Sequence, residues 1–214
     1  MRTIRVTGKG NIKVRPDTTR LTISLGGVFP DYAEAINRST SETEALRELL
    51  VELGFKSTAL KTLSFDIDAE YESYRDEHDN YKRRFVGYRY SHELKIEFLS
   101  NNELLGKTLF KLGQSKLAPE FRISFTVSDP EAAKNELLGK AVQDALEKAE
   151  VLTKAAGLSL GAIQTVDYSW GEINMEVRPV DRGLMSPSAT PCEMAIEPDD
   201  IEMSDTVTVV WEIT

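Results

Sequence analysis

The sequence predicts an α+β fold of mixed, largely antiparallel sheets, with one long helix and one shorter helix packed on them. Three observations predict it. Segments that alternate apolar and polar residues are typical of half-buried strands. Other segments repeat apolar residues at helical spacing, and strands and helices follow one another in mixed order. With 214 residues, 41% hydrophobic and 29% charged, the chain can form a core without disulfides or a structural metal.

The first half of the chain combines strands, a helix and a hairpin. The patterns predict a short strand from Ile4 to Gly8, a turn at 8–11, a strand at 20–26, a helix from Pro30-Asp31 to Gly54, and a hairpin of strands 57–73 and 83–99 with its tip at Glu77-His78-Asp79-Asn80.

The second half contains the long helix. Its start is Ser128-Asp129-Pro130-Glu131, which supplies a capping side chain, a proline in the first turn and an acidic residue. We expect its apolar stripe to be Leu138, Ala141, Val142, Ala145, Ala149, Leu152 and Ala156. The elements predicted here are a helix at 102–112, a strand at 121–127, the long helix at 128–156, a strand at 162–170, a loop at 171–200 and a strand at 203–213.

These elements predict a single domain over 1–214. We expect two interlocked α/β sandwich subdomains, 1–100 and 101–200, and a C-terminal strand at 203–213 that closes the fold. The sheet order and the contacts between the subdomains do not follow from the patterns.

The charge of the chain is acidic and unevenly distributed. Its 35 Asp and Glu residues exceed its 26 Lys and Arg residues, so the formal net charge is −9. Such a surface repels phosphate groups, which disfavours nucleic acids and anionic membranes as partners. Residues 1–30 carry six basic groups and one acidic group, whereas 191–214 carry seven acidic groups and no Lys or Arg. We therefore expect the first and last strands to be neighbours.

The expected location rests on the N-terminus, because a single cysteine leaves the redox compartment open. Cys192 is the one cysteine, so no intramolecular disulfide can form. The chain begins directly in a strand pattern, without the apolar region of a signal peptide, and contains no run of about 20 apolar residues. We expect a cytoplasmic protein as the sequence stands, and a secreted or periplasmic one if a signal was trimmed.

An acidic stripe on the hairpin is the first candidate site. One face of the first strand carries four carboxylates, and the opposite face carries Phe65, Ile67, Ala69 and Tyr71. The stripe consists of Asp66, Asp68, Glu70 and Glu72. Four carboxylates could bind Ca²⁺, but neither EF-hand spacing nor a glycine pivot is present. We favour cross-strand ion pairs, Glu72 with Arg83 and Asp66 with Arg89.

The remaining candidates have structural explanations that we favour. His78 falls at the hairpin tip, and His92 falls on the apolar face of its strand; neither has a metal-ligand partner at suitable spacing. Cys192 stands between Pro191 and Glu193, and an acidic neighbour does not activate a thiol. Val6-Thr7-Gly8-Lys9-Gly10 lacks the spacing of a phosphate-binding loop, so we expect a turn.

The loop at 171–200 is a candidate binding surface. It contains four prolines and three methionines, and flexible thioether side chains suit adaptable binding surfaces. A disordered surface loop is an equally good interpretation.

Five blocks in order resemble the SIMPL-domain family and cover nearly the whole chain. They are Val6-Thr-Gly-Lys-Gly with Pro16-Asp17; the strand Thr62 to Tyr71 with Val86-Gly-Tyr-Arg-Tyr-Ser; Ile123-Ser-Phe-Thr-Val-Ser-Asp-Pro-Glu; the helical segment Ala141 to Gly157; and a Pro-rich loop before the strand Thr206 to Ile213.

The resemblance implies properties that the residues alone do not. The family includes bacterial periplasmic immunogenic proteins, proteins linked to oxidative-stress defence, a mammalian relative associated with a signalling kinase, and members that form ring-like or channel-like homo-oligomers. No catalytic residues are established for it, so the resemblance supplies none.

We expect a non-enzymatic, self-associating scaffold or binding module in a stress response, with contacts supplied by the long alanine-rich helix and the loop at 171–200. Its partners would be copies of itself and an unidentified protein, without nucleic acid or a membrane span. We assign no catalytic, cofactor-binding or metal-binding residue. The alternative is a small-ligand or cation-binding protein that uses the acidic hairpin at 66–72.

Overall fold

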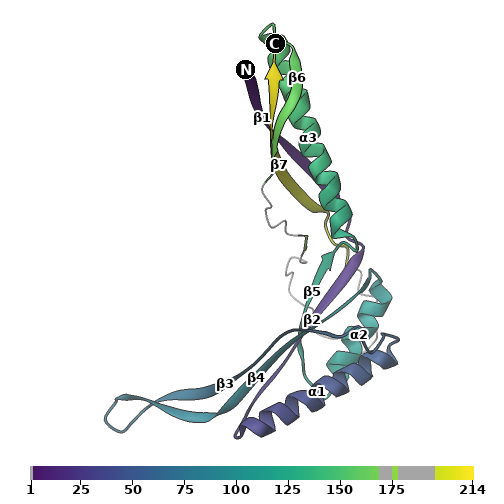
Figure 1. Ribbon diagram of the computed structural model, residues 1–214. Helices are drawn as coiled ribbons and strands as arrows, with labels where there is room; N and C mark the ends of the chain where they lie inside the picture. The colour runs from purple at the N-terminus through teal and green to yellow at the C-terminus, as the bar shows by residue number, and fades with distance from the viewer. Residues whose placement is uncertain (1, 169–174, 178–195) are drawn as a thin grey trace. The chain divides into compact units, whose positions relative to one another are not determined.

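The computed structural model describes residues 2–168, 175–177 and 196–214 (Figure 1). Its elements are β1 (Thr3–Val14), β2 (Thr18–Phe29), α1 (Tyr32–Glu52), β3 (Lys61–Arg75), β4 (Tyr81–Leu99), α2 (Asn102–Gln114), β5 (Glu120–Thr126), α3 (Pro130–Ala155), β6 (Leu160–Asp167) and β7 (Ile201–Ile213). They form two antiparallel sheets with helices, so the predicted α+β class is confirmed. No helix in the described ranges is long and apolar enough to span a membrane.

The described residues form two compact units. The first is drawn from Met1–Asp17, Phe125–Val177 and Pro198–Thr214, and the second from Thr18–Ser124 and Arg178–Glu197. In the first unit, a sheet of order β1-β7-β6 packs against α3. In the second, a sheet of order β3-β4-β2-β5 packs its apolar side chains with those of α1 and α2.

The first and last strands are neighbours, as the charge distribution predicts. β1 pairs with β7 in antiparallel register from Thr3 opposite Glu212 to Val14 opposite Ile201. Lys13 forms an ion pair with Glu202 across this register, and the acidic partner raises the pKa of Lys13. The end of the chain therefore completes the sheet that its beginning starts.

The turn expected at 8–11 was wrong, because β1 continues through it to Val14. The glycines allow α3 to lie directly on the strand. A Cβ atom added to Gly8 would lie 2.1 Å from the Ala141 carbonyl oxygen, and one added to Gly10 would lie 2.2 Å from that of Leu137. Glycine is needed here for close packing rather than for chain reversal.

α3 begins as predicted, but its buried stripe differs from the predicted one. Asp129 accepts a hydrogen bond from the Ala132 N–H at the N-terminus. Val142 and Leu152 were expected in the core but are 37% and 52% exposed. Small residues at four-residue intervals allow α3 to approach β1 closely. They occupy the buried positions in which Val142 and Leu152 were expected. The buried residues are Ala133, Leu137, Ala141, Ala145, Ala149 and Thr153.

Candidate binding arm

The hairpin of β3 and β4 extends beyond the sheet to which it belongs. β2 pairs with β4 only as far as Phe29 opposite Tyr88, whereas β3 and β4 continue pairing to Arg75 opposite Tyr81. Residues 70–87, called the arm below, are therefore a two-stranded ribbon. In Figure 1 it projects from the rest of its sheet, past the start of α1.

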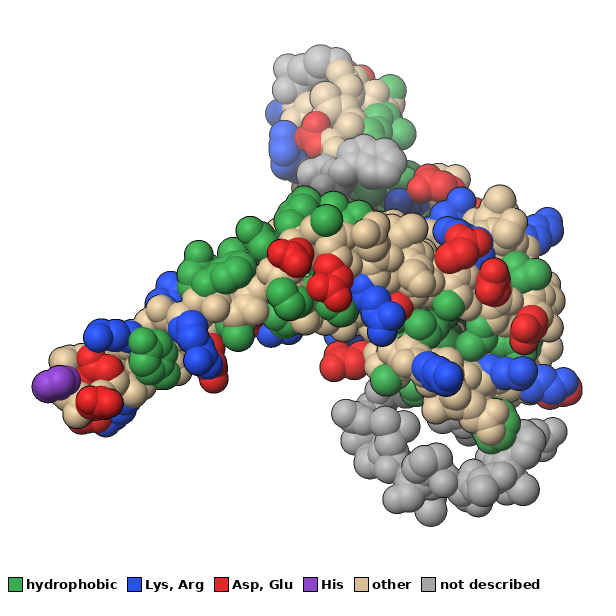
Figure 2. Space-filling model, turned by 90° about the horizontal axis from the view of Figure 1, so that it is seen from below, with side chains coloured by type: hydrophobic (Ala, Val, Ile, Leu, Met, Phe, Trp, Pro, Cys, Tyr) green, Lys and Arg blue, Asp and Glu red, His purple; other side chains and the backbone are tan. Residues whose placement is uncertain are grey.

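One face of the arm carries a continuous row of aromatic rings. Tyr71 and Phe85 have centroids 5.7 Å apart, Phe85 and Tyr88 5.3 Å, and Tyr88 and Tyr32 of α1 5.5 Å, each pair edge-to-face. We call these four residues the aromatic stripe. Tyr71, Phe85 and Tyr32 are 47%, 45% and 51% exposed. Figure 2 shows hydrophobic side chains along one side of the arm. Such a contiguous apolar surface is typical of an interaction site.

The acidic residues lie on the opposite face of the arm and pair with arginines, but in a different register from the predicted one. Glu72 pairs with Arg84 at 2.6 Å instead of Arg83. Arg89 donates two hydrogen bonds of 2.9 Å to Glu70, and Asp66 lies opposite Ser91. The expected pairs Glu72–Arg83 and Asp66–Arg89 were therefore wrong.

The turn at the tip already pairs Glu72 with Arg84, and a β-bulge shifts the register by one further residue. The pairing passes from Glu70 opposite Gly87 to Tyr71 opposite Phe85, so Val86 is the extra residue. Gly87 has φ +150°, and a Cβ atom there would lie 2.3 Å from the Phe29 carbonyl oxygen. The bulge also moves Phe85, rather than Val86, to the face of Tyr71.

The acidic stripe does not converge on a cation site. The hydrogen bonds from Arg89 lower the pKa of Glu70, which keeps the carboxylate ionised and engaged. Within residues 2–168, 175–177 and 196–214, no group of three or more His, Cys, Asp or Glu side chains could hold a metal ion. Glu70 and Glu72 instead stabilise the pairing of the two strands.

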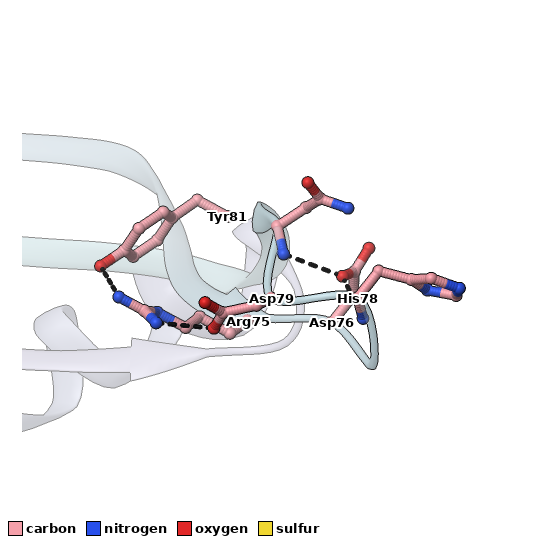
Figure 3. Close-up of polar contacts among 6 residues, drawn as sticks. Arg75, Asp76, His78, Asp79 and Tyr81 are labelled. Carbon is pink, nitrogen blue, oxygen red and sulfur yellow. Dashed lines mark hydrogen bonds and ion pairs between the residues drawn. The ribbon is translucent and has the colours of Figure 1, made fainter.

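The tip of the arm is ordered by its own polar side chains (Figure 3). Asp76 accepts hydrogen bonds from the N–H groups of His78 and Asn80, and it forms an ion pair with Lys82. The hydrogen bond from Lys82 is the largest of the effects that lower the pKa of Asp76. Arg75 donates to Asp79 and to the Tyr81 hydroxyl. His78 therefore lies in a turn, as expected.

His92 is a buried residue of the second unit that joins three elements. Its Nδ1 lies 3.1 Å from the Thr43 hydroxyl of α1, and its Nε2 lies 2.9 Å from the Thr62 hydroxyl of β3. Its ring packs edge-to-face against Phe65 at 5.1 Å. Burial lowers its pKa. This is the environment of a core histidine with hydrogen-bonded ring nitrogens.

Most of the other candidates fall outside the described residues. Cys192 and most of the loop at 171–200 lie outside the described residues. Within that loop, Met175 is buried in the first unit, and Val177 exchanges backbone hydrogen bonds with Phe125. The aromatic stripe was missed from the sequence, although the aromatic residues of both hairpin strands were a visible signal.

Comparisons with known proteins agree over nearly the whole chain. A family model described as SIMPL, protein of unknown function (DUF541), matches residues 4–211. The "26 kDa periplasmic immunogenic protein" of Brucella abortus (strain S19) is 27% identical over 217 residues, covering 98% of this chain and 84% of that protein. The protein of the same name from Brucella melitensis biotype 1 is 26% identical over the same length, with the same coverage.

Proposed function

Because the chain belongs to the SIMPL family, whose function is unknown, we propose that it is a non-enzymatic, self-associating binding module. Its contact surface in this proposal is the aromatic face of the arm. The observation that carries the proposal is a two-stranded ribbon with half-exposed aromatic rings on one face. The proposed setting is a stress response, which rests on the family resemblance alone.

The physical argument concerns the stability of the arm. A two-stranded hairpin is marginally stable in water unless a third strand, a helix or a partner covers one face. β2 ends at Phe29, so among the described strands none pairs with the arm in the way that β2 supports the rest of β4. Association that covers the stripe would remove its rings from water. Burial of apolar surface stabilises a complex by about 25 cal/mol per Å². The uncovered face of the arm is therefore suited to binding another molecule.

Light scattering coupled to size-exclusion chromatography tests the proposal. We expect the wild-type protein to elute as an oligomer at micromolar concentration, and the double variant Tyr71→Ser/Phe85→Ser to shift toward monomer. Tyr74→Ser is the matched control, because Tyr74 is 43% exposed and lies beside Arg84 on the opposite face of the arm. A wild-type protein that is monomeric throughout would refute self-association.

The proposed location is the periplasm rather than the cytoplasm. Its support is that both Brucella relatives are named periplasmic. Fractionation of cells that express the protein from its native gene tests this location. Recovery in the cytoplasmic fraction alone would contradict it.

A further inference from the structure

The two ends of the aromatic stripe carry opposite charges. At one end, Asp31 is the N-cap residue of α1, directly before Tyr32, and Glu34 lies in the first turn. At the other end, the Arg83 guanidinium lies 5.0 Å from the centroid of the Tyr71 ring. The stripe therefore runs from an acidic end on α1 to a basic end on the arm.

These three charged groups differ from the other charges of the hairpin. Asp31 makes no side-chain hydrogen bond to the helix that it precedes. In the part of the chain that the structure describes, none of Asp31, Glu34 and Arg83 takes part in an ion pair. Arg84 and Arg89, in contrast, are already bonded to Glu72 and Glu70. The charges at the ends of the stripe remain available to a partner.

We propose that two copies of this chain pack stripe against stripe about a twofold axis, with Arg83 of each copy against Asp31 and Glu34 of the other. This inference rests on the proposed function and specifies its contact. A twofold axis that lies in the contact plane and runs perpendicular to the stripe reverses the direction of the second stripe, so the acidic end of each copy faces the basic end of the other. The charge pattern makes the stripe complementary to itself.

Other occupants fit this charge pattern less well. An anionic lipid surface would attract Arg83 but repel Asp31 and Glu34 at the other end. Pairing of two arms through like edges would bring two acidic β3 strands together, or two copies of the basic segment 82–84. Face-to-face packing of two stripes avoids both conflicts.

The expected contact is small. Three half-exposed aromatic rings and the partly buried Tyr88 offer roughly 350 Å² per copy, which is less than half of a standard interface. Such a contact dissociates on dilution, and its charge pairs weaken as salt screens them. Sedimentation velocity over about 1 to 100 μM, at low and high salt, covers this range.

Charge-reversal complementation tests the proposal with the full-length chain. Arg83→Glu and Asp31→Lys/Glu34→Lys each place like charges at both ends of a homodimer. We expect each variant to associate at least about tenfold more weakly than the wild type, and an equimolar mixture to recover wild-type association as a heterodimer. Recovery in the mixture also shows that both variants are folded.

The controls reverse equivalent charges away from the stripe. Arg122→Glu matches the first variant, and Asp66→Lys/Asp68→Lys on the opposite face of β3 matches the second. We expect both controls to associate like the wild type. Association of the stripe variants at wild-type strength, or failure of their mixture to recover, overturns the twofold stripe contact while self-association stands. A monomeric wild type overturns both.

Discussion

Individual glycines determine how closely helix and strand approach in the first unit. In the sequence, Gly8 and Gly10 carry the same signal as a turn, because glycine is favoured both where the chain reverses and where backbones touch. Only the position of α3 distinguishes these two uses, and that position depends on contacts far apart in the chain. The local sequence therefore predicted a turn where the structure has a continuous strand.

Substitution of Gly8 tests this packing. Gly8→Ala places a methyl group 2.1 Å from a carbonyl oxygen of α3, so helix and strand must separate. We expect the free energy of unfolding to fall by roughly 1–3 kcal/mol or more in urea titrations. Gly139→Ala is the control, because no described atom beyond its own turn of helix lies within 4 Å of its added Cβ, and alanine favours the helix. Equal stability of Gly8→Ala and the wild type would show that α3 does not lie on β1.

At the scale of elements, the sequence predicted local order better than register. The start of α3 followed from its capping residues, and the pairing of β1 with β7 followed from charge. The hairpin and the two faces of its first strand were also predicted. The register of the arm was not, because the tip turn sets one pairing and the bulge at Val86 shifts it by a further residue, and neither leaves a signal in the alternation of the strands. Beyond the bulge, the alternation used for prediction no longer applies to β4.

The contacts of His92 with α1 and β3 predict a pH dependence. Unfolded His92 binds a proton as the pH falls through about 6.5, whereas burial holds the folded pKa lower. The unfolded state thus binds more protons in this window, so stability is lost as the pH falls from 6.5 through the folded pKa. We expect urea midpoints to decrease between about pH 7.5 and pH 5.5.

Two histidine variants assign this effect. His92→Gln removes the titrating ring, so its urea midpoint should change less over the same window. His78→Gln, at the exposed tip of the arm, should retain the wild-type dependence. The assignment fails if the two variants respond to pH in the same way.

At the scale of the whole molecule, the distinguishing feature is an exposed apolar surface, the aromatic stripe. The compact units bury their own cores, but the aromatic stripe remains half exposed. The sequence predicted self-association with contacts from the long helix and the loop at 171–200, and it did not reveal the aromatic stripe. It could not locate it, because the stripe joins α1 to both strands of the hairpin and depends on the bulge. The structure locates the stripe, and self-association through it is our proposal.

Hydrogen exchange measured by mass spectrometry as a function of protein concentration tests the central claim most directly. If copies associate through the arm, amides at 70–87 should gain protection as the concentration rises, while peptides from α3 and β7 stay unchanged. The Tyr71→Ser/Phe85→Ser variant should show no such gain. Protection of the arm that is independent of concentration, in a sample shown to contain oligomers, would contradict the claim that the arm forms the contact.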